Sequence, residues 1–321
     1  MSGVLLDWQQ QILGAHERIR AIVLETPVVG SSHPSRDISP RVKFKLENQQ
    51  RTGSFKLRGA SNALCLLTPA QARAGVLTSS TGNHGLAVAT AAKTLGIQAE
   101  VYVSTQVSAK KLETIRNCGA EVRVVGSNPL DAELAARAAA RESGRKYISP
   151  YNDPDVIAGQ GTVAVELHHQ LPRIDAVFVA VGGGGLIGGI GAYLKAVSPD
   201  TQIIGCWPEN SPALCESLKQ GRIVDVPERP TLSESTAGGV EPGAITFELG
   251  QKVIDLAILV SEAEILGAMR QLRDREGWVV EGAAGVALAG FLKHAEEFAD
   301  KTAVIVLCGG NLSPGVLQRL R

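Results

Sequence analysis

Apolar and polar positions along this chain fall into two alternating patterns. Short apolar runs rich in Val, Ile and Ala indicate strands buried on both faces, whereas apolar residues spaced three and four apart indicate helices. The predicted strands are 42–47, 75–79, 99–103, 121–125, 176–181, 202–207 and 303–307. The predicted helices are 56–67, 84–94, 109–118, 129–142, 156–169, 186–197, 262–276 and 283–295.

This alternation predicts an α/β protein with a mostly parallel open sheet flanked by helices. Such sheets bind ligands where loops leave the carboxyl ends of the strands. Residues 220–245 have the weakest pattern and are rich in Pro, Glu, Ser and Gly. That segment fits either an active-site loop or an oligomer contact.

Composition narrows the class of protein. With 321 residues, 44% of them apolar, the chain can build one large domain or two. Its 32 basic and 32 acidic residues cancel, so we expect neither nucleic acid nor a membrane surface as a partner. The five cysteines lack metal or disulfide spacing, and the first seven residues lack signal-peptide features, so a cytoplasmic enzyme is expected.

One uncharged stretch, 176–194, is nearly long enough to span a bilayer. Seven of its nineteen residues are glycine, however, and four of these are consecutive. We therefore interpret it as a strand, a glycine loop (residues 182–185) and a helix. Successive backbone amides without side chains at the start of a helix suit a phosphate group.

A lysine occupies an unusual position in the segment Thr-Gly-Ser-Phe-Lys at 52–56. Lys56 follows a turn and opens a predicted helix, which places its amine at a junction rather than on a solvated face. A lysine held out of water has a lowered pKa and becomes nucleophilic, as a Schiff base to an aldehyde requires. A surface lysine beside a turn is the plainer interpretation of this segment alone.

A second polar turn, Ser-Ser-Thr-Gly-Asn-His-Gly at 79–85, also joins a predicted strand to a helix. Its hydroxyl and amide side chains lie beside unpaired helix amides, which favour an anion such as a substrate carboxylate. An ordinary helix cap would use the same residue types.

The glycine loop also fits a nicotinamide cofactor. Gly183, Gly185 and Gly188 spell GxGxxG, a strand follows, and Glu209 lies twenty-one residues beyond Gly188, where an acid would bind the ribose. In a run so rich in glycine this match carries little weight, and it leaves Lys56 and Asn83 unexplained.

Three further segments decide between these interpretations: Lys-Leu-Glu-Asn at 45–48, Pro-Asp-Val-Ile-Ala-Gly-Gln-Gly-Thr at 154–162, and Cys-Gly-Gly-Asn at 308–311. In this order and spacing, the six segments resemble the fold-type II pyridoxal-phosphate enzymes, within the serine/threonine dehydratase and serine racemase branch. The resemblance implies a tryptophan synthase β-like fold with a large cofactor-binding domain (1–68 and 152–321) and a small mobile domain (69–151). It also implies a homodimer.

The resemblance implies a role for each matching residue. Lys56 would anchor pyridoxal 5'-phosphate and later move the α-proton, with Thr81 as the candidate group on the opposite face. The remaining cofactor contacts would be Phe55, Asn83, Gly182, Gly183, Gly184, Gly185, Leu186, Gly239, Glu281 and Cys308. Substrate would contact Ser80, Thr81, Asn83, His84 and Tyr151.

Cys308 stands where most of the family has Ser, opposite the ring nitrogen. A neutral group there weakens the cofactor as an electron sink, which favours loss of a β-leaving group. The expected activity is therefore elimination from a β-hydroxy amino acid such as L-threonine or L-serine, in amino-acid catabolism. Thr81 replaces the Ser of racemases and the Ala of many dehydratases, so racemisation stays an alternative, as does a dehydratase of hydroxyectoine breakdown.

A metal is not expected at the family's cation site. The Glu-Pro dipeptide where that site begins in relatives is replaced here by Trp207-Pro208, and Ser211 and Ala213 stand at the later ligand positions. These residues do not supply the carboxylates that a divalent cation needs.

Overall fold

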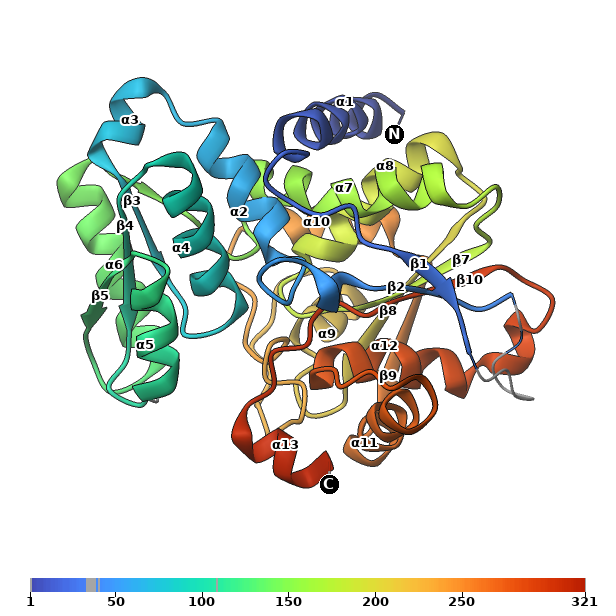
Figure 1. The fold of residues 1–321 in the computed structure, drawn as a ribbon. Helices are drawn as coiled ribbons and strands as arrows, with labels where there is room; N and C mark the ends of the chain where they lie inside the picture. Colours follow the sequence, from blue (N-terminus) through green and yellow to red (C-terminus); the bar gives the residue numbers. More distant parts are fainter. Residues whose placement is uncertain (1, 33–38, 40, 108, 321) are drawn as a thin grey trace.

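Two separate sheets organise the chain in the computed structural model, which describes residues 2–32, 39, 41–107 and 109–320 (Figure 1). Across these residues the larger sheet has the strand order β1-β2-β10-β7-β8-β9 and the smaller one β5-β4-β3-β6. The larger sheet contains β1 (Val28–Gly30), β2 (Lys43–Lys45), β7 (Ala176–Ala180), β8 (Gln202–Pro208), β9 (Leu256–Val260) and β10 (Ala303–Val306). The smaller sheet contains β3 (Val76–Ser79), β4 (Ala99–Val103), β5 (Glu121–Val124) and β6 (Lys146–Tyr147).

The last strand of the chain lies inside the larger sheet. β10 pairs in parallel with both β2 and β7, and Ile305 has Phe44 and Phe178 as its register partners. Only β1 runs antiparallel to its neighbour among the described pairs. The chain that leaves β10 is thereby brought beside the segments that follow β2 and β7, although these are far apart in sequence.

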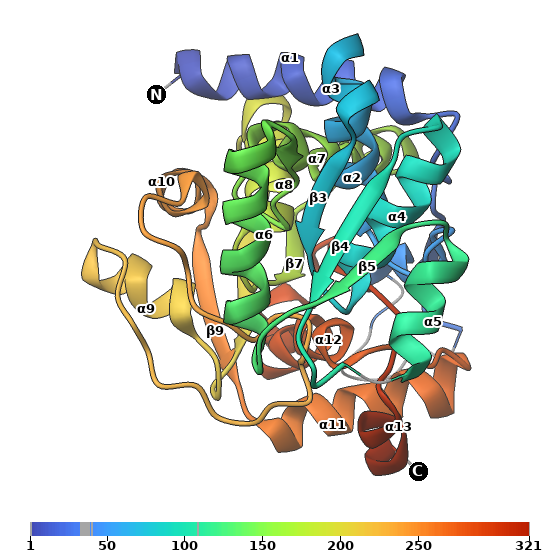
Figure 2. The same cartoon turned by 90° about the vertical axis from the view of Figure 1, so that its left-hand side faces the viewer.

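Helices cover both faces of each sheet, as buried parallel strands require. In Figure 1 one face of the larger sheet is covered by α1 (Ser2–Ile19), α7 (Pro154–Gln170), α8 (Gly185–Val197) and α10 (Ile245–Val253), and the other by α11 (Glu262–Gln271), α12 (Gly282–Lys293) and α13 (Pro314–Leu320). Around the smaller sheet, α6 (Pro129–Ser143) lies opposite α4 (Asn83–Leu95) and α5 (Ala109–Asn117), as Figures 1 and 2 show. The remaining helices are α2 (Lys56–Cys65), α3 (Pro69–Ala74), α9 (Ala213–Gln220), and short turns at Glu47–Gln49, Leu272–Glu276 and Ala295–Phe298.

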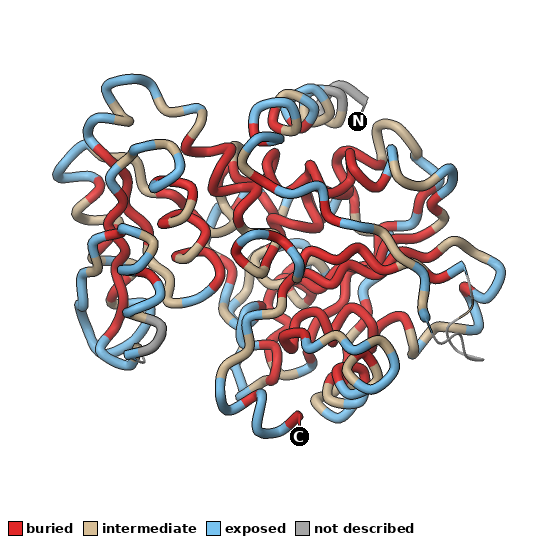
Figure 3. Tube along the Cα trace, in the orientation of Figure 1, coloured by how far each residue is buried: buried red, intermediate tan, exposed pale blue. Residues whose placement is uncertain are grey.

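Glycines allow three helices to touch at their backbones. A β-carbon added to Gly159 of α7 would lie 2.6 Å from the Cα of Gly59 in α2, and one added to Gly189 of α8 would lie 2.5 Å from the carbonyl oxygen of Ile157. α7 therefore lies directly between α2 and α8. Figure 3 shows that these helices and both sheets are mostly buried, with exposure concentrated on loops and outer helices.

Every strand and helix predicted from the pattern is present, with bounds that shift by a few residues. The helix predicted at 262–276 is α-helical to Gln271 and continues as a π-helical turn at Leu272–Glu276. The predicted ranges did not include β1, β6 and β9, or α1, α3, α9, α10 and α13. β1 and β6 are two or three residues long, which is too short for periodicity to show. No described helix is long and apolar enough to cross a bilayer.

Candidate active site

The turn before Lys56 is held by the chain that leaves β10. The backbone N–H of Phe55 donates to the carbonyl of Cys308 at 3.1 Å, and Ser54 forms an isolated bridge with Gly309. Lys56 is the first residue of α2. Its Nζ donates to the carbonyl oxygen of Pro150 at 2.7 Å and lies 5.2 Å from the centroid of the Phe55 ring.

Burial gives this amine an altered proton affinity. Loss of water around Nζ lowers the pKa of Lys56 to about 8, and the nearby Cys308 and Glu281 offset only part of that effect. Roughly a tenth of the amine is therefore unprotonated at pH 7, far more than for an ordinary lysine. That is the property the sequence predicted for a nucleophilic lysine.

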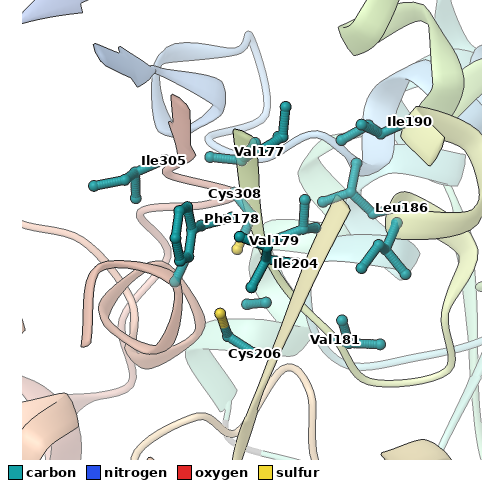
Figure 4. Close-up of a cluster of buried hydrophobic side chains, with 14 of the residues drawn as sticks. Val177, Phe178, Val179, Val181, Leu186, Ile190, Ile204, Cys206, Ile305 and Cys308 are labelled. Carbon is teal, nitrogen blue, oxygen red and sulfur yellow. The ribbon is translucent and has the colours of Figure 1, made fainter. Parts of the chain in front are cut away.

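Cys308 lies two residues after β10 and belongs to a cluster of buried apolar side chains. It is 3% exposed and belongs to the apolar core that includes Phe178, Val179 and Ile305, which Figure 4 labels together. Burial raises the pKa of the Cys308 thiol well above its ordinary value. The thiol is thus neutral, and it can act as a weak hydrogen-bonding group but not as a charge.

Asn83 and Glu281 connect the two sheet units at the site. Asn83, the first residue of α4, donates from Nδ2 to both carboxylate oxygens of Glu281 at 2.9 and 3.1 Å. Its Oδ1 accepts a hydrogen bond from Asn311 Nδ2 at 2.7 Å, and Ser235 donates to Glu281 at 2.7 Å. Burial raises the pKa of Glu281. The amide of Asn83 is therefore fixed in one orientation.

His84 is neutral and buried. Its Nε2 lies 3.0 Å from the carbonyl oxygen of Ile148, and since a carbonyl only accepts, Nε2 carries the hydrogen. Burial and the nearby Lys56 lower the pKa of His84 to about 3. Nδ1 is a buried acceptor without a hydrogen-bonding partner in the described structure. A charged imidazole is thus not available for a substrate carboxylate, although the backbone amides that begin α4 are.

The turn before α4 carries Ser80 and Thr81, both half-buried. The N–H of Gly82 donates to Ser80 Oγ at 3.1 Å. Gly85 allows the turn to close, because a β-carbon there would lie 2.1 Å from the carbonyl oxygen of Ser80. Ser80 and Thr81 therefore lie at the amino end of α4, beside Asn83.

The glycine loop joins β7 to α8. Gly184 caps α8 with φ of 90°, in the left-handed region that favours glycine. A β-carbon at Gly182 would lie 2.9 Å from Thr236, and one at Gly183 would lie 2.4 Å from the Tyr151 ring. The loop is therefore enclosed by other segments, and only glycine fits it. Backbone amides at the start of a helix, such as those of this loop and of Leu186, suit an anion.

Tyr151 contacts both the glycine loop and the segment 220–245. Its hydroxyl accepts a hydrogen bond from the backbone N–H of Glu241 at 3.0 Å, and burial raises the pKa of Tyr151 to about 12. Gly239 is exposed, and a β-carbon there would meet nothing within 4 Å, so no described side chain encloses it. In the part of the chain that the structure describes, no group of three or more His, Cys, Asp and Glu side chains is arranged to hold a metal.

Three further residues contact the predicted site without having been predicted as part of it: Pro150 bonds Lys56, Ser235 bonds Glu281 and Asn311 bonds Asn83. Two of them lie in segments that the sequence already marks as functional candidates: Asn311 ends the Cys-Gly-Gly-Asn motif, and Ser235 lies within 220–245. Pro150 acts through its carbonyl oxygen, which no side-chain pattern could reveal.

A family of known enzymes matches this chain. The model of the family described as "Pyridoxal-phosphate dependent enzyme" matches residues 19–309, nearly the whole chain. The chain belongs to that family. The pyridoxal-phosphate interpretation is confirmed, and the nicotinamide alternative built on Gly183, Gly185 and Gly188 is set aside. Gly188 has a packing role, because a β-carbon there would lie 2.9 Å from Leu249 of α10.

Individual relatives of this pyridoxal-phosphate enzyme agree with the fold. An L-threonine ammonia-lyase of Thermotoga maritima is 37% identical over 97% of this chain and 77% of its own length. The processed form of threonine deaminase isoform 2 from Solanum lycopersicum superposes with a TM-score of 0.93 at 32% identity, covering 100% of this chain and 93% of its own. Maize serine racemase superposes with a TM-score of 0.90 at 30% identity, covering 97% and 95%.

The residues present suit the family's cofactor. An aldehyde needs an uncharged amine, a phosphate needs free amides, and a pyridine nitrogen needs a neighbour, and these are present in Lys56, the glycine loop and Cys308 respectively. All three lie at the carboxyl ends of β7 and β10 or at the start of α2, the edge where parallel sheets bind ligands.

Proposed function

We propose that this protein removes the β-hydroxyl and the amino group from a β-hydroxy amino acid such as L-threonine or L-serine, giving a 2-oxo acid and ammonia. The observation that carries the proposal is a backbone hydrogen bond from Phe55 to Cys308, which holds the segments of two groups together. These groups are the Lys56 amine, whose pKa is lowered, and the neutral buried thiol of Cys308. The similarity to threonine ammonia-lyases and deaminases supports it.

Bound pyridoxal phosphate withdraws electrons from the amino acid and makes its α-proton acidic. In our proposal Lys56 holds the cofactor's aldehyde carbon, and the amides of the glycine loop and Leu186 hold its phosphate. The ring would be contacted by Phe55, Asn83, Gly239, Glu281 and Cys308.

Once substrate has released it, the Lys56 amine takes the α-proton as general base. A pKa of about 8 suits this task, because an effective base has a pKa near the working pH. The neutral Cys308 thiol does not supply a charge that would keep a proton on the ring nitrogen. Electron density left by the α-proton is then best relieved by departure of the β-hydroxyl, which takes up a proton and leaves as water, so elimination is favoured. Hydrolysis of the released enamine by one water then gives the 2-oxo acid and ammonia.

Substrate binding would use the start of α4. In our proposal the backbone amides after Gly82 and the hydroxyls of Ser80 and Thr81 would bind the substrate carboxylate, with Asn83 and His84 behind them. We further propose that residues 69–151 form a small mobile domain that closes on the large domain (1–68 and 152–321) and excludes water. The bond between Asn83 and Glu281 supports this, because it joins the two units across the site.

The test uses the purified holoenzyme. It should absorb near ~410–420 nm as a lysine-bound cofactor, borohydride should fix the cofactor to Lys56, and L-threonine or L-serine should release a keto acid. The Lys56→Ala variant should lose both the colour and the activity. A coloured protein that releases no keto acid from any β-hydroxy amino acid would contradict the proposal.

Racemisation is the second candidate, favoured by the similarity to a serine racemase and by the hydroxyl of Thr81. The extra methyl of Thr restricts its rotamers, which makes proton delivery from the opposite face less effective. We therefore place elimination first. Chiral analysis of the remaining amino acid in the same assay separates the two, because only a racemase returns the D-isomer.

We also propose that the protein is a cytoplasmic homodimer. All five cysteines are free thiols, which fits a reducing compartment. The dimer rests on the family resemblance alone. Light scattering coupled to gel filtration checks it, since a particle of twice the 33.7 kDa chain mass is expected.

A further inference from the structure

The ring of Tyr151 borders the site, and Tyr151 follows directly after the residue that bonds Lys56. Pro150 receives the hydrogen bond of Lys56 Nζ, and the next residue, Tyr151, turns its ring against Gly183. At its far end the Tyr151 hydroxyl accepts from the N–H of Glu241. The ring thus reaches from the glycine loop to the loop that carries Glu241. Tyr151 is therefore the neighbour in sequence of the residue that bonds Lys56, and its ring lies against the glycine loop of the same site.

The charged side chains near Tyr151 include more carboxylates than cations. Arg137 of α6 lies 2.8 Å from an oxygen of Glu241 and 2.8 Å from an oxygen of Glu133, and its guanidinium stacks on the Tyr147 ring at 4.6 Å. Arg137 and Glu241 are only 28% and 25% exposed, so water screens this charge weakly. One guanidinium faces two carboxylates, and the cluster carries one net negative charge.

Glu241 has unused capacity to accept a hydrogen bond. Its Oε2 bonds Arg137, whereas Oε1 is buried without a hydrogen-bonding partner in the described structure. An unpaired carboxylate oxygen favours a donor such as a hydroxyl and disfavours a second acceptor.

We propose that Glu241 is a specificity residue that admits neutral β-hydroxy side chains and rejects those with a second carboxylate. It does so by giving the Arg137 cluster a net negative charge, since Glu133 alone would already balance Arg137, and by offering Oε1 to a donor. A dicarboxylic amino acid would bring a third negative charge against one guanidinium, and built-in repulsion of this kind is an effective source of discrimination. The inference rests on the proposed function.

The test compares L-threonine with L-threo-3-hydroxyaspartate on the holoenzyme. In Glu241→Gln the side chain keeps its size, but the cluster loses its net negative charge because only Glu133 still faces Arg137. The ratio of kcat/KM for hydroxyaspartate to that for threonine should therefore rise roughly 10- to 100-fold. Calorimetry gives a readout without turnover: the affinity for L-aspartate relative to L-alanine should rise in the same direction. Glu133→Gln, which removes the other carboxylate, should show the same sign with a smaller effect.

Two controls isolate the cause. Glu234→Gln removes a charge from the same loop at a residue that bonds Ser313 rather than Arg137, and it should leave both ratios unchanged. Adding Arg137→Gln to Glu241→Gln should abolish the gain. The specificity proposal is overturned if wild type uses threonine but neither ratio moves in Glu241→Gln, or if the double variant keeps the gain. Inactivity of the wild type on both threonine and serine would instead overturn the proposed function and this inference with it.

Discussion

Burial shifts the pKa of three side chains at the site. Lys56 loses proton affinity, while Cys308 and Glu281 retain their protons more strongly than in water. The direction is the same in each case, since burial disfavours whichever form is charged. The result is a cluster in which the amine can act as a base and the thiol stays uncharged.

The lysine gives a pH-dependent prediction. Apoprotein should capture pyridoxal phosphate at a rate that rises with pH and levels off, with a midpoint at about pH 8, because only the unprotonated amine attacks. An ordinary lysine would give a midpoint near ~10.4. Stopped-flow absorbance across a pH series measures this. In Glu281→Gln the midpoint should fall further, because Glu281 raises the pKa of Lys56; an unchanged or higher midpoint would refute the electrostatic coupling.

Among the elements, α7 sets the spacing of the site. It touches α2, which begins with Lys56, through Gly159 and Gly59, and it touches α8, which begins with the glycine loop, at Ile157 and Gly189. The cofactor's anchor and its phosphate cradle are thus both placed against one helix. Glycine is needed because the backbones approach more closely than any β-carbon allows.

Gly159→Ala should therefore cost stability. The new β-carbon would lie 2.6 Å from the Cα of Gly59 and from the carbonyl oxygen of Arg58, so α2 must shift. Overpacking of this kind costs about 1–3 kcal/mol and should also weaken cofactor binding. Urea denaturation and a cofactor titration measure the two effects.

Gly267→Ala is the matched control for this substitution. Gly267 is also helical, in α11, but a β-carbon there meets nothing within 4 Å. It should gain up to about 1 kcal/mol from helix propensity. Equal stability of the two variants would show that the α2–α7 contact is not tight.

Across the whole molecule, four buried charges join distant parts of the chain. Arg58 on α2 bonds Glu47 after β2 and Glu166 on α7, and Lys45 of β2 also bonds Glu166 at 2.6 Å. None of the four side chains is more than 2% exposed. Two positive and two negative charges balance, which is the condition for burying them.

Arg58→Met should unbalance this network. Glu47 and Glu166 would face each other without the guanidinium, which is expected to destabilise the fold by about 3–5 kcal/mol. Arg20→Met breaks an exposed ion pair with Glu17 of α1, and it should cost less than about 1 kcal/mol of stability. Denaturant titration compares them, and similar losses would show that the buried network is not a determinant of stability.

The sequence by itself determined the α/β class, the lysine turn, the glycine loop and the cofactor family, because each depends on residues that are neighbours along the chain. Only the tertiary structure decided that β10 lies between β2 and β7, which brings Cys308 to Phe55, and that Asn83 meets Glu281 and Arg137 meets Glu241. Periodicity reports which face of an element is buried but not which element covers it. Long-range pairing follows from the packing of the complete chain, and the specificity proposed for Glu241 arises from it.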